Sequence, residues 1–108
     1  MTDLAGRIAE SIVGYFFRSI PGLDVAHFPA RSTEPEVDFV LTVGLQRIPV
    51  EVKYRHHIDR RDIAGLQAFL DKPHYNAPFG ILVTLLDKMV FDDSHIVPLP
   101  LSSLLLMR

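Results

Sequence analysis

The chain contains the run Ile48-Pro49-Val50-Glu51-Val52-Lys53-Tyr54, in which every second residue is apolar or aromatic. An earlier run, Glu36-Val37-Asp38-Phe39-Val40-Leu41, shows a similar alternation, and this period of two is typical of half-buried β-strands. Gly44 lies between the runs and favours a tight reversal, so the sequence predicts a β-hairpin with strands over residues 36–43 and 47–54. In the first strand, Val37, Phe39, Leu41 and Val43 are predicted to face one way, and Asp38, Val40 and Thr42 the other.

Three charged residues interrupt the apolar pattern of this hairpin: Asp38 on the first strand, and Glu51 and Lys53 on the second. Strand periodicity puts Glu51 and Lys53 on one face. Charges within apolar strands are costly unless they are paired or bind a metal. Two neighbouring carboxylates suit a hard cation such as Mg²⁺, which polarises a phosphoryl oxygen and lowers the pKa of a bound water. The pattern therefore indicates metal-dependent phosphodiester hydrolysis; the alternative, a structural ion pair within the hairpin, leaves Asp38 unexplained.

The rest of the sequence predicts helices and strands on both sides of the hairpin. Leu4, Ile8, Ile12 and Phe16 recur every four residues, and the broad apolar arc around them predicts a helix covered on most sides. We expect an α/β fold in a single domain spanning residues 1–108, with a central sheet flanked by helices. The predicted helices cover residues 3–20, 59–71 and 101–107, the further strands cover 25–29, 80–86, 89–91 and 96–99, and residues 31–35 form a turn.

The composition excludes several classes of protein. The 108 residues include no cysteine, so neither disulfides nor a thiolate zinc site can hold the fold. The formal net charge of −2 argues against a stand-alone DNA-binding protein, which is usually basic. No apolar stretch is long enough to cross a membrane, so we expect a soluble, cytoplasmic protein. The main basic region is either a phosphate-contacting surface or an ordinary charged one, and comprises Arg47, Lys53, Arg55, His56, His57, Arg60 and Arg61.

The combination of Pro35-Glu36-Val37-Asp38 with Val50-Glu51-Val52-Lys53 resembles the PD-(D/E)xK signature of restriction-endonuclease-like nucleases. The predicted order of elements matches the αβββαβ core of that superfamily, a central mixed sheet flanked by helices. Together with Asn76-Ala77-Pro78-Phe79-Gly80-Ile81, these runs are most similar to the nuclease-like C-terminal domain of prokaryotic AAA-type ATPases. The proline of the motif is not adjacent to Asp38, which is a departure from the common pattern.

The resemblance implies a nuclease site with Mg²⁺ or Mn²⁺ as cofactor and DNA as substrate. Asp38, Glu51 and the main-chain carbonyl of Val52 would hold the metal, and Lys53 would assist the attacking water. Gln67, on the apolar face of the second predicted helix, would orient a ligand or phosphate beside Glu51 or Lys53. Glu10 on the first helix either completes the acidic cluster or is an ordinary solvated glutamate.

The alternative to a nuclease is a catalytically silent module that keeps the fold and serves interaction or dimerisation in an ATPase system. The missing basic surplus and the C-terminal leucines, which we expect to be exposed, favour this alternative. An ATPase domain or subunit, or a second copy of the chain, would then be the partner. Whether Asp38, Glu51 and Lys53 converge on one open pocket distinguishes the two hypotheses.

Overall fold

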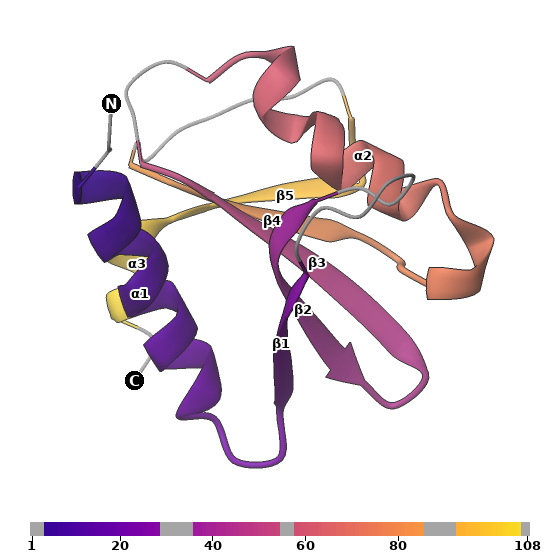
Figure 1. The fold of residues 1–108 in the computed structure, drawn as a ribbon, viewed down its shortest axis with the longest axis horizontal. Helices are drawn as coiled ribbons and strands as arrows, with labels where there is room; N and C mark the ends of the chain where they lie inside the picture. Colours follow the sequence, from indigo (N-terminus) through magenta and orange to yellow (C-terminus); the bar gives the residue numbers. More distant parts are fainter. Residues whose placement is uncertain (1–3, 29–35, 55–57, 86–92, 107–108) are drawn as a thin grey trace.

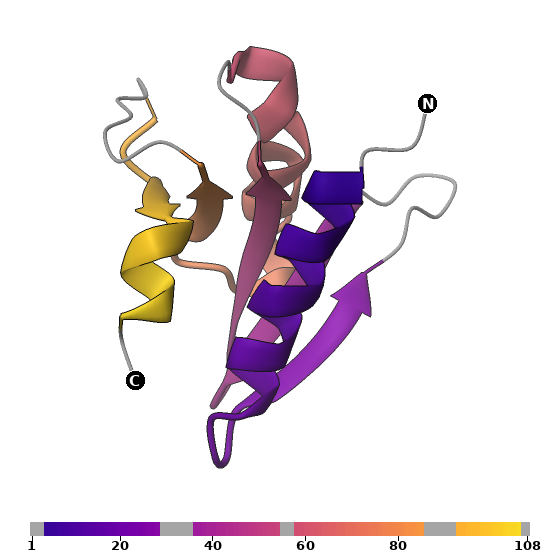
Figure 2. The same cartoon turned by 90° about the vertical axis from the view of Figure 1, so that its left-hand side faces the viewer.

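The predicted hairpin lies at the centre of a five-stranded sheet in the computed structural model, which describes residues 4–28, 36–54, 58–85 and 93–106. The strand order is β1-β2-β3-β4-β5. Strands β1, β2 and β3 pair antiparallel, whereas β3, β4 and β5 pair parallel, so the sheet is mixed. Helices α1 and α3 cover one face of the sheet and α2 covers the other (Figures 1 and 2). The prediction of an α/β fold with a sheet flanked by helices is confirmed.

The elements follow the order predicted from the sequence, with small differences in their limits. The segment predicted as one helix over residues 59–71 begins as a 3₁₀ turn, which a reciprocal pair of hydrogen bonds between Asp59 and Asp62 caps. The described elements are α1 (Leu4–Arg18), β1 (Asp24–Phe28), β2 (Val37–Val43), β3 (Gln46–Lys53), η1 (Arg60–Ile63), α2 (Ala64–Leu70), η2 (Pro73–Tyr75), β4 (Gly80–Thr84), β5 (Ile96–Pro100) and α3 (Leu101–Leu105).

Two apolar clusters hold the three layers together, one on each face of the sheet. The cluster under α1 and α3 includes Val13, Phe17, Phe39, Leu41, Val50, Val83 and Leu104. The cluster under α2 includes Val37, Val40, Ile63, Leu66, Phe69, Tyr75, Leu82 and Ile96. Because β3 and β4 are covered on both faces, their side chains are largely buried, which explains the nearly continuous apolar sequence of β4.

One prediction of strand phase is wrong. Val37 packs with Val40 under α2, not with Phe39 and Leu41 under α1. The register of β1 against β2 shifts here, because the three residues of β1 from Ala26 to Phe28 lie opposite the four residues of β2 from Val40 to Val37. An extra residue of this kind turns the strand and reverses the side-chain alternation beyond it. The irregularity lies at Asp38, the first residue of the predicted site.

The outer side of α1 differs from the prediction of a helix covered on most sides. Its buried residues are Ala9, Val13, Gly14 and Phe17, whereas Leu4 and Ile8 are more than half exposed. The sheet covers only one side of α1, and no described element packs on the other. The helix therefore presents an apolar outer side to solvent.

The C-terminal leucines also differ in part from the prediction that they are exposed. Leu99 and Leu101 pack against the core and Leu104 is buried beside α1, whereas Leu106 is exposed. The predicted turn over residues 31–35, the predicted strand over residues 89–91 and the pair His56-His57 lie outside the described residues. None of the helices in the described part of the chain has the length and apolarity needed to cross a membrane.

Candidate active site

The predicted hairpin residues Asp38 and Glu51 meet where β2 separates from β3. The antiparallel register ends at the pair Phe39 and Val50, and one further step places Asp38 opposite Glu51. At this step, hydrogen bonds from main-chain N–H groups to side-chain carboxylates take the place of the main-chain hydrogen bonds of the ladder. The main-chain N–H of Val52 donates to Oδ2 of Asp38 at 2.7 Å, and the N–H of Asp38 donates to Oε1 of Glu51 at 3.1 Å. Each strand therefore holds the carboxylate of the other in place.

Helix α2 closes over Glu51 and removes it from water, so that this side chain is only 8% exposed. Gly65 makes the close approach possible, because a Cβ added there would lie 2.5 Å from the main-chain oxygen of Glu36 and 3.6 Å from Oε2 of Glu51. A side chain at position 65 would therefore overlap the main chain of Glu36. The glycine is therefore part of the wall that shields the carboxylate.

The electrostatics of the pair follow from this burial. Desolvation of Glu51 raises its pKa to about 8, and the charge of Asp38 and a side-chain hydrogen bond to Asp38 act in the same direction. The ammonium group of Lys53 opposes this shift only in part. Without a cation, Glu51 therefore favours its protonated form over a second negative charge beside Asp38. Such a pair accommodates a divalent cation readily once the proton leaves.

A hollow of about 200 Å³ opens on the α1 side of the pair. Asp38, Val52 and Lys53 line it from the sheet, and Glu10 and Arg7 line it from α1. Asp38 and Lys53 converge on this open pocket as predicted, but Glu51 does not line it, because its side chain is buried beside Gly65 under α2. Within the described ranges, the ammonium group of Lys53 forms no ion pair with a carboxylate, which argues against a structural ion pair as its role.

Glu10 lies near the pair but does not join it directly. Burial raises the pKa of Glu10, and the charge of Asp38 contributes to the same shift, so the two side chains interact electrostatically. Among the residues that the structure describes, no group of three or more His, Cys, Asp or Glu side chains is arranged to hold one metal ion. The expectation that Glu10 completes the acidic cluster as a third ligand is therefore not met. The site has two carboxylates, with Glu10 beside them.

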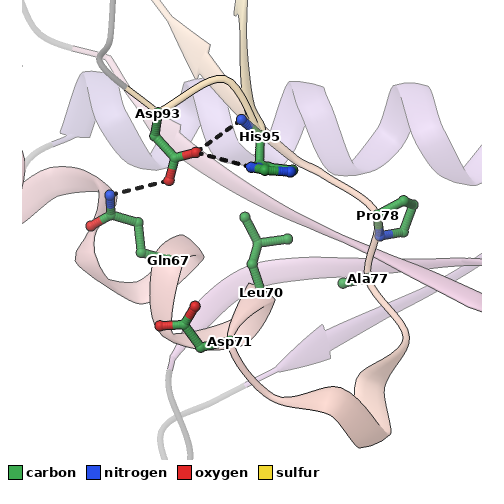
Figure 3. A pocket seen from close by; sticks show the side chains of 7 residues that line it. All are labelled: Gln67, Leu70, Asp71, Ala77, Pro78, Asp93 and His95. Atoms are coloured by element: carbon green, nitrogen blue, oxygen red, sulfur yellow. Dashed lines mark hydrogen bonds and ion pairs between the residues drawn. The ribbon is translucent and has the colours of Figure 1, made fainter.

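Gln67 does not lie where the resemblance implied. It is half-buried, but its amide donates to Oδ2 of Asp93 at 3.3 Å rather than to a group of the carboxylate pair. It lines a different hollow, of about 550 Å³, together with Leu70 and His95 (Figure 3). Its position on α2 follows from the burial of Leu66 and Phe69, which leaves Gln67 at the margin of the packed face. Gln67 is thus not part of the carboxylate site.

Sequence reasoning missed two residues that shape the site, Gly65 and Arg7. Glycine in the middle of a helix costs about 1 kcal/mol relative to alanine, so Gly65 within α2 was a signal of close packing. Arg7 carried no such signal, because a charged residue on an amphipathic helix is ordinary. Only the packing of α1 against the hairpin brings Arg7 to the rim of the hollow.

The fold and this site define an α/β domain in which a β-hairpin holds two neighbouring carboxylates through main-chain N–H groups, and one of them, Asp38, lines a pocket beside a lysine. The chain belongs to the family described as Domain of unknown function (DUF4143), whose model matches residues 5–104. This domain is found in ATPase-associated proteins. No curated protein matches the chain.

Proposed function

We propose that the chain is a PD-(D/E)xK-like, metal-dependent nuclease domain that hydrolyses phosphodiester bonds of DNA. The observation that carries the proposal is the pair of carboxylates on adjacent strands, Asp38 and Glu51, with Lys53 lining the same hollow as Asp38. The order of elements, a helix, three strands, a helix and a strand, also supports it.

The donor set fits Mg²⁺ or Mn²⁺ better than it fits zinc. Mg²⁺ is usually held by one or two carboxylates and keeps several waters or phosphate oxygens as further ligands. Asp38 and Glu51 supply two carboxylates, and the main-chain carbonyl of Val52 is the proposed third donor. Burial and, after it, the charge of Asp38 raise the pKa of Glu51, and a divalent cation would relieve the repulsion between the two carboxylates.

The residues of the chain then have distinct tasks. Asp38 and Glu51 fix the position of the ion, which when bound polarises a phosphoryl oxygen and lowers the pKa of a coordinated water. Lys53 orients the attacking water and offsets the negative charge that develops on the phosphate. Gly65 and α2 keep bulk water away from Glu51, which strengthens these interactions. Glu10, on α1, changes the electrostatic potential at Asp38 through its own charge.

Calorimetric titration with Mg²⁺ and Mn²⁺, followed by a DNA cleavage assay, tests the proposal. Wild type should bind one divalent ion and cleave DNA, and Asp38→Asn should do neither. Lys53→Met should bind the ion but lose cleavage by roughly 100-fold or more, because a group acting in the transition state is removed. Lys72→Met is the matched control, since it makes the same change at a lysine that lines neither this hollow nor the predicted basic region.

The alternative is a catalytically silent module that acts through an ATPase domain or subunit. The exposed apolar side of α1, with Leu4, Ile8 and Tyr15, is the observation that favours it. A wild type that binds no divalent ion and cleaves no DNA, alone or with the ATPase, would support this alternative and contradict the nuclease.

A further inference from the structure

A second hollow, of about 390 Å³, lies between α1 and the strands β1 and β2. Arg7 and Glu10 line both this hollow and the one that holds Asp38 and Lys53, so the two hollows are neighbours along α1, and together we call them the groove. Away from the carboxylates, the lining changes from acidic to basic and aromatic and is formed by Tyr15, Arg18, His27 and Phe39. The volume lies within the range of ligand-binding clefts.

The two arginines of this groove are placed to contact phosphates. Arg7 and Arg18 are separated by 11 positions on α1, about 16 Å along the helix axis, and both are exposed. Within the described part of the chain, neither guanidinium group forms an ion pair with a carboxylate. The guanidinium of Arg18 lies over the ring of Phe39 at 5.6 Å, which holds it in place while its charge is retained. Guanidinium groups held in this way suit phosphate oxygens.

An aromatic side chain lies on α1 between these two positive charges. Tyr15 is 76% exposed and lines the same hollow. The ring of His27 packs on Phe39 at 5.1 Å and covers the strand side of the groove. A basic groove with an accessible aromatic ring is the arrangement by which proteins bind single-stranded nucleic acids, where phosphates contact arginines and unpaired bases stack.

We infer that this groove binds a single-stranded segment of nucleic acid and leads it to the carboxylate pair. The inference rests on the proposed nuclease function and specifies the form of its substrate. A duplex keeps its base faces stacked inside the helix and offers none to Tyr15, whereas a single strand exposes them.

Fluorescence anisotropy with a short labelled oligothymidine, and with a DNA duplex of the same length, tests the inference in buffer containing EDTA. Wild type should bind the oligothymidine more tightly than the duplex. Tyr15→Ala should weaken binding of the single strand by roughly fivefold or more, and Tyr15→Phe, which keeps the ring, should bind as wild type does. Arg7→Ala should weaken binding and reduce the slope of log affinity against log salt by about 0.7. Lys72→Ala, which removes a positive charge outside the groove, should leave the affinity unchanged.

Asp38→Asn separates the two proposals, because it removes a metal ligand without touching the arginines. If this variant binds oligothymidine as wild type does while wild type binds no metal, the groove is supported and the nuclease is not. Wild-type affinity in both Arg7→Ala and Tyr15→Ala would overturn the inference even if the protein cleaves DNA. Tighter binding of the duplex, or no binding of the single strand, would also overturn it.

Discussion

Asp38 and Glu51 hold each other through the main chain: Glu51 accepts the N–H of Asp38, and Asp38 accepts the N–H of Val52, the residue after Glu51. Two ladder positions of the hairpin are thus occupied by carboxylates in place of carbonyl groups. The hairpin itself therefore sets the distance between the two acidic groups. A site built in this way needs no loop to arrange it.

We expect Asp38→Asn to leave the metal-free protein as stable as wild type, or more stable. Asparagine keeps an oxygen that can accept the N–H of Val52, and the substitution removes a charge that destabilises Glu51. The rise in melting temperature caused by Mg²⁺ or Mn²⁺ should disappear, because the ligand site is lost. Thermal melts of both proteins with and without metal measure both effects.

Asp38→Ala provides the contrast, because it removes the acceptor as well as the charge. Leaving the N–H of Val52 without this partner should cost about 1–3 kcal/mol of the free energy of unfolding. If Asp38→Asn proves as destabilising as Asp38→Ala, the side chain has a structural role that depends on its charge, and the metal assignment is wrong.

The stability of the metal-free protein should fall as the pH rises through 8. The pKa of Glu51 is about 4.5 in the unfolded chain and about 8 in the folded one. Between these values the folded state holds a proton that the unfolded state has released, so raising the pH favours unfolding. Urea denaturation at several pH values in EDTA measures the slope. Glu51→Gln should flatten it in this range, and an unchanged slope in that variant would assign the effect to another group.

Gly65→Ala should destabilise the protein even though alanine is the better helix former. The gain in helix propensity is about 1 kcal/mol, whereas overpacking typically costs about 1–3 kcal/mol. The cost should prevail here, since the added Cβ would lie 2.5 Å from a main-chain oxygen, that of Glu36, which cannot rotate away. Chemical denaturation gives the difference in free energy. Greater stability in the variant would mean that α2 can move away from β2 at little cost.

The local pattern of the sequence was sufficient to predict the hairpin and the meeting of its charged residues. Register follows from alternation and from the turn at Gly44, so Asp38, Glu51 and Lys53 were placed at one end of β2 and β3. The face on which Val37 lies was not predictable, because it depends on how β2 pairs with β1. The bulge in this pairing does not show in the alternation of apolar residues along β2.

The side chains on helices were predicted less well than those on the hairpin. Periodicity identifies the apolar arc of a helix but not which part of a broad arc meets the sheet. On α1 the packed part runs through Val13 and Phe17, and Leu4 and Ile8 remain outside it. The same ambiguity misplaced Gln67, whose position depends on how α2 is rotated about its axis.

The last prediction concerns Gln67, where the resemblance and the structure disagree. Its amide donates to Asp93, which also accepts the main-chain N–H of His95 at 2.9 Å. The bond from Gln67 is long, at 3.3 Å, and the Asp93 side chain is 26% exposed, so water can replace the lost donor. Gln67→Ala should therefore cost only about 0.5–1 kcal/mol of the free energy of unfolding. The stabilisation by Mg²⁺ or Mn²⁺ should equal that of wild type, since no ligand of the pair is altered. Thermal melts with and without metal provide both values in one experiment. A variant that folds normally but is no longer stabilised by metal would show that Gln67 reaches the site once the ion binds, and would restore the role implied by the resemblance.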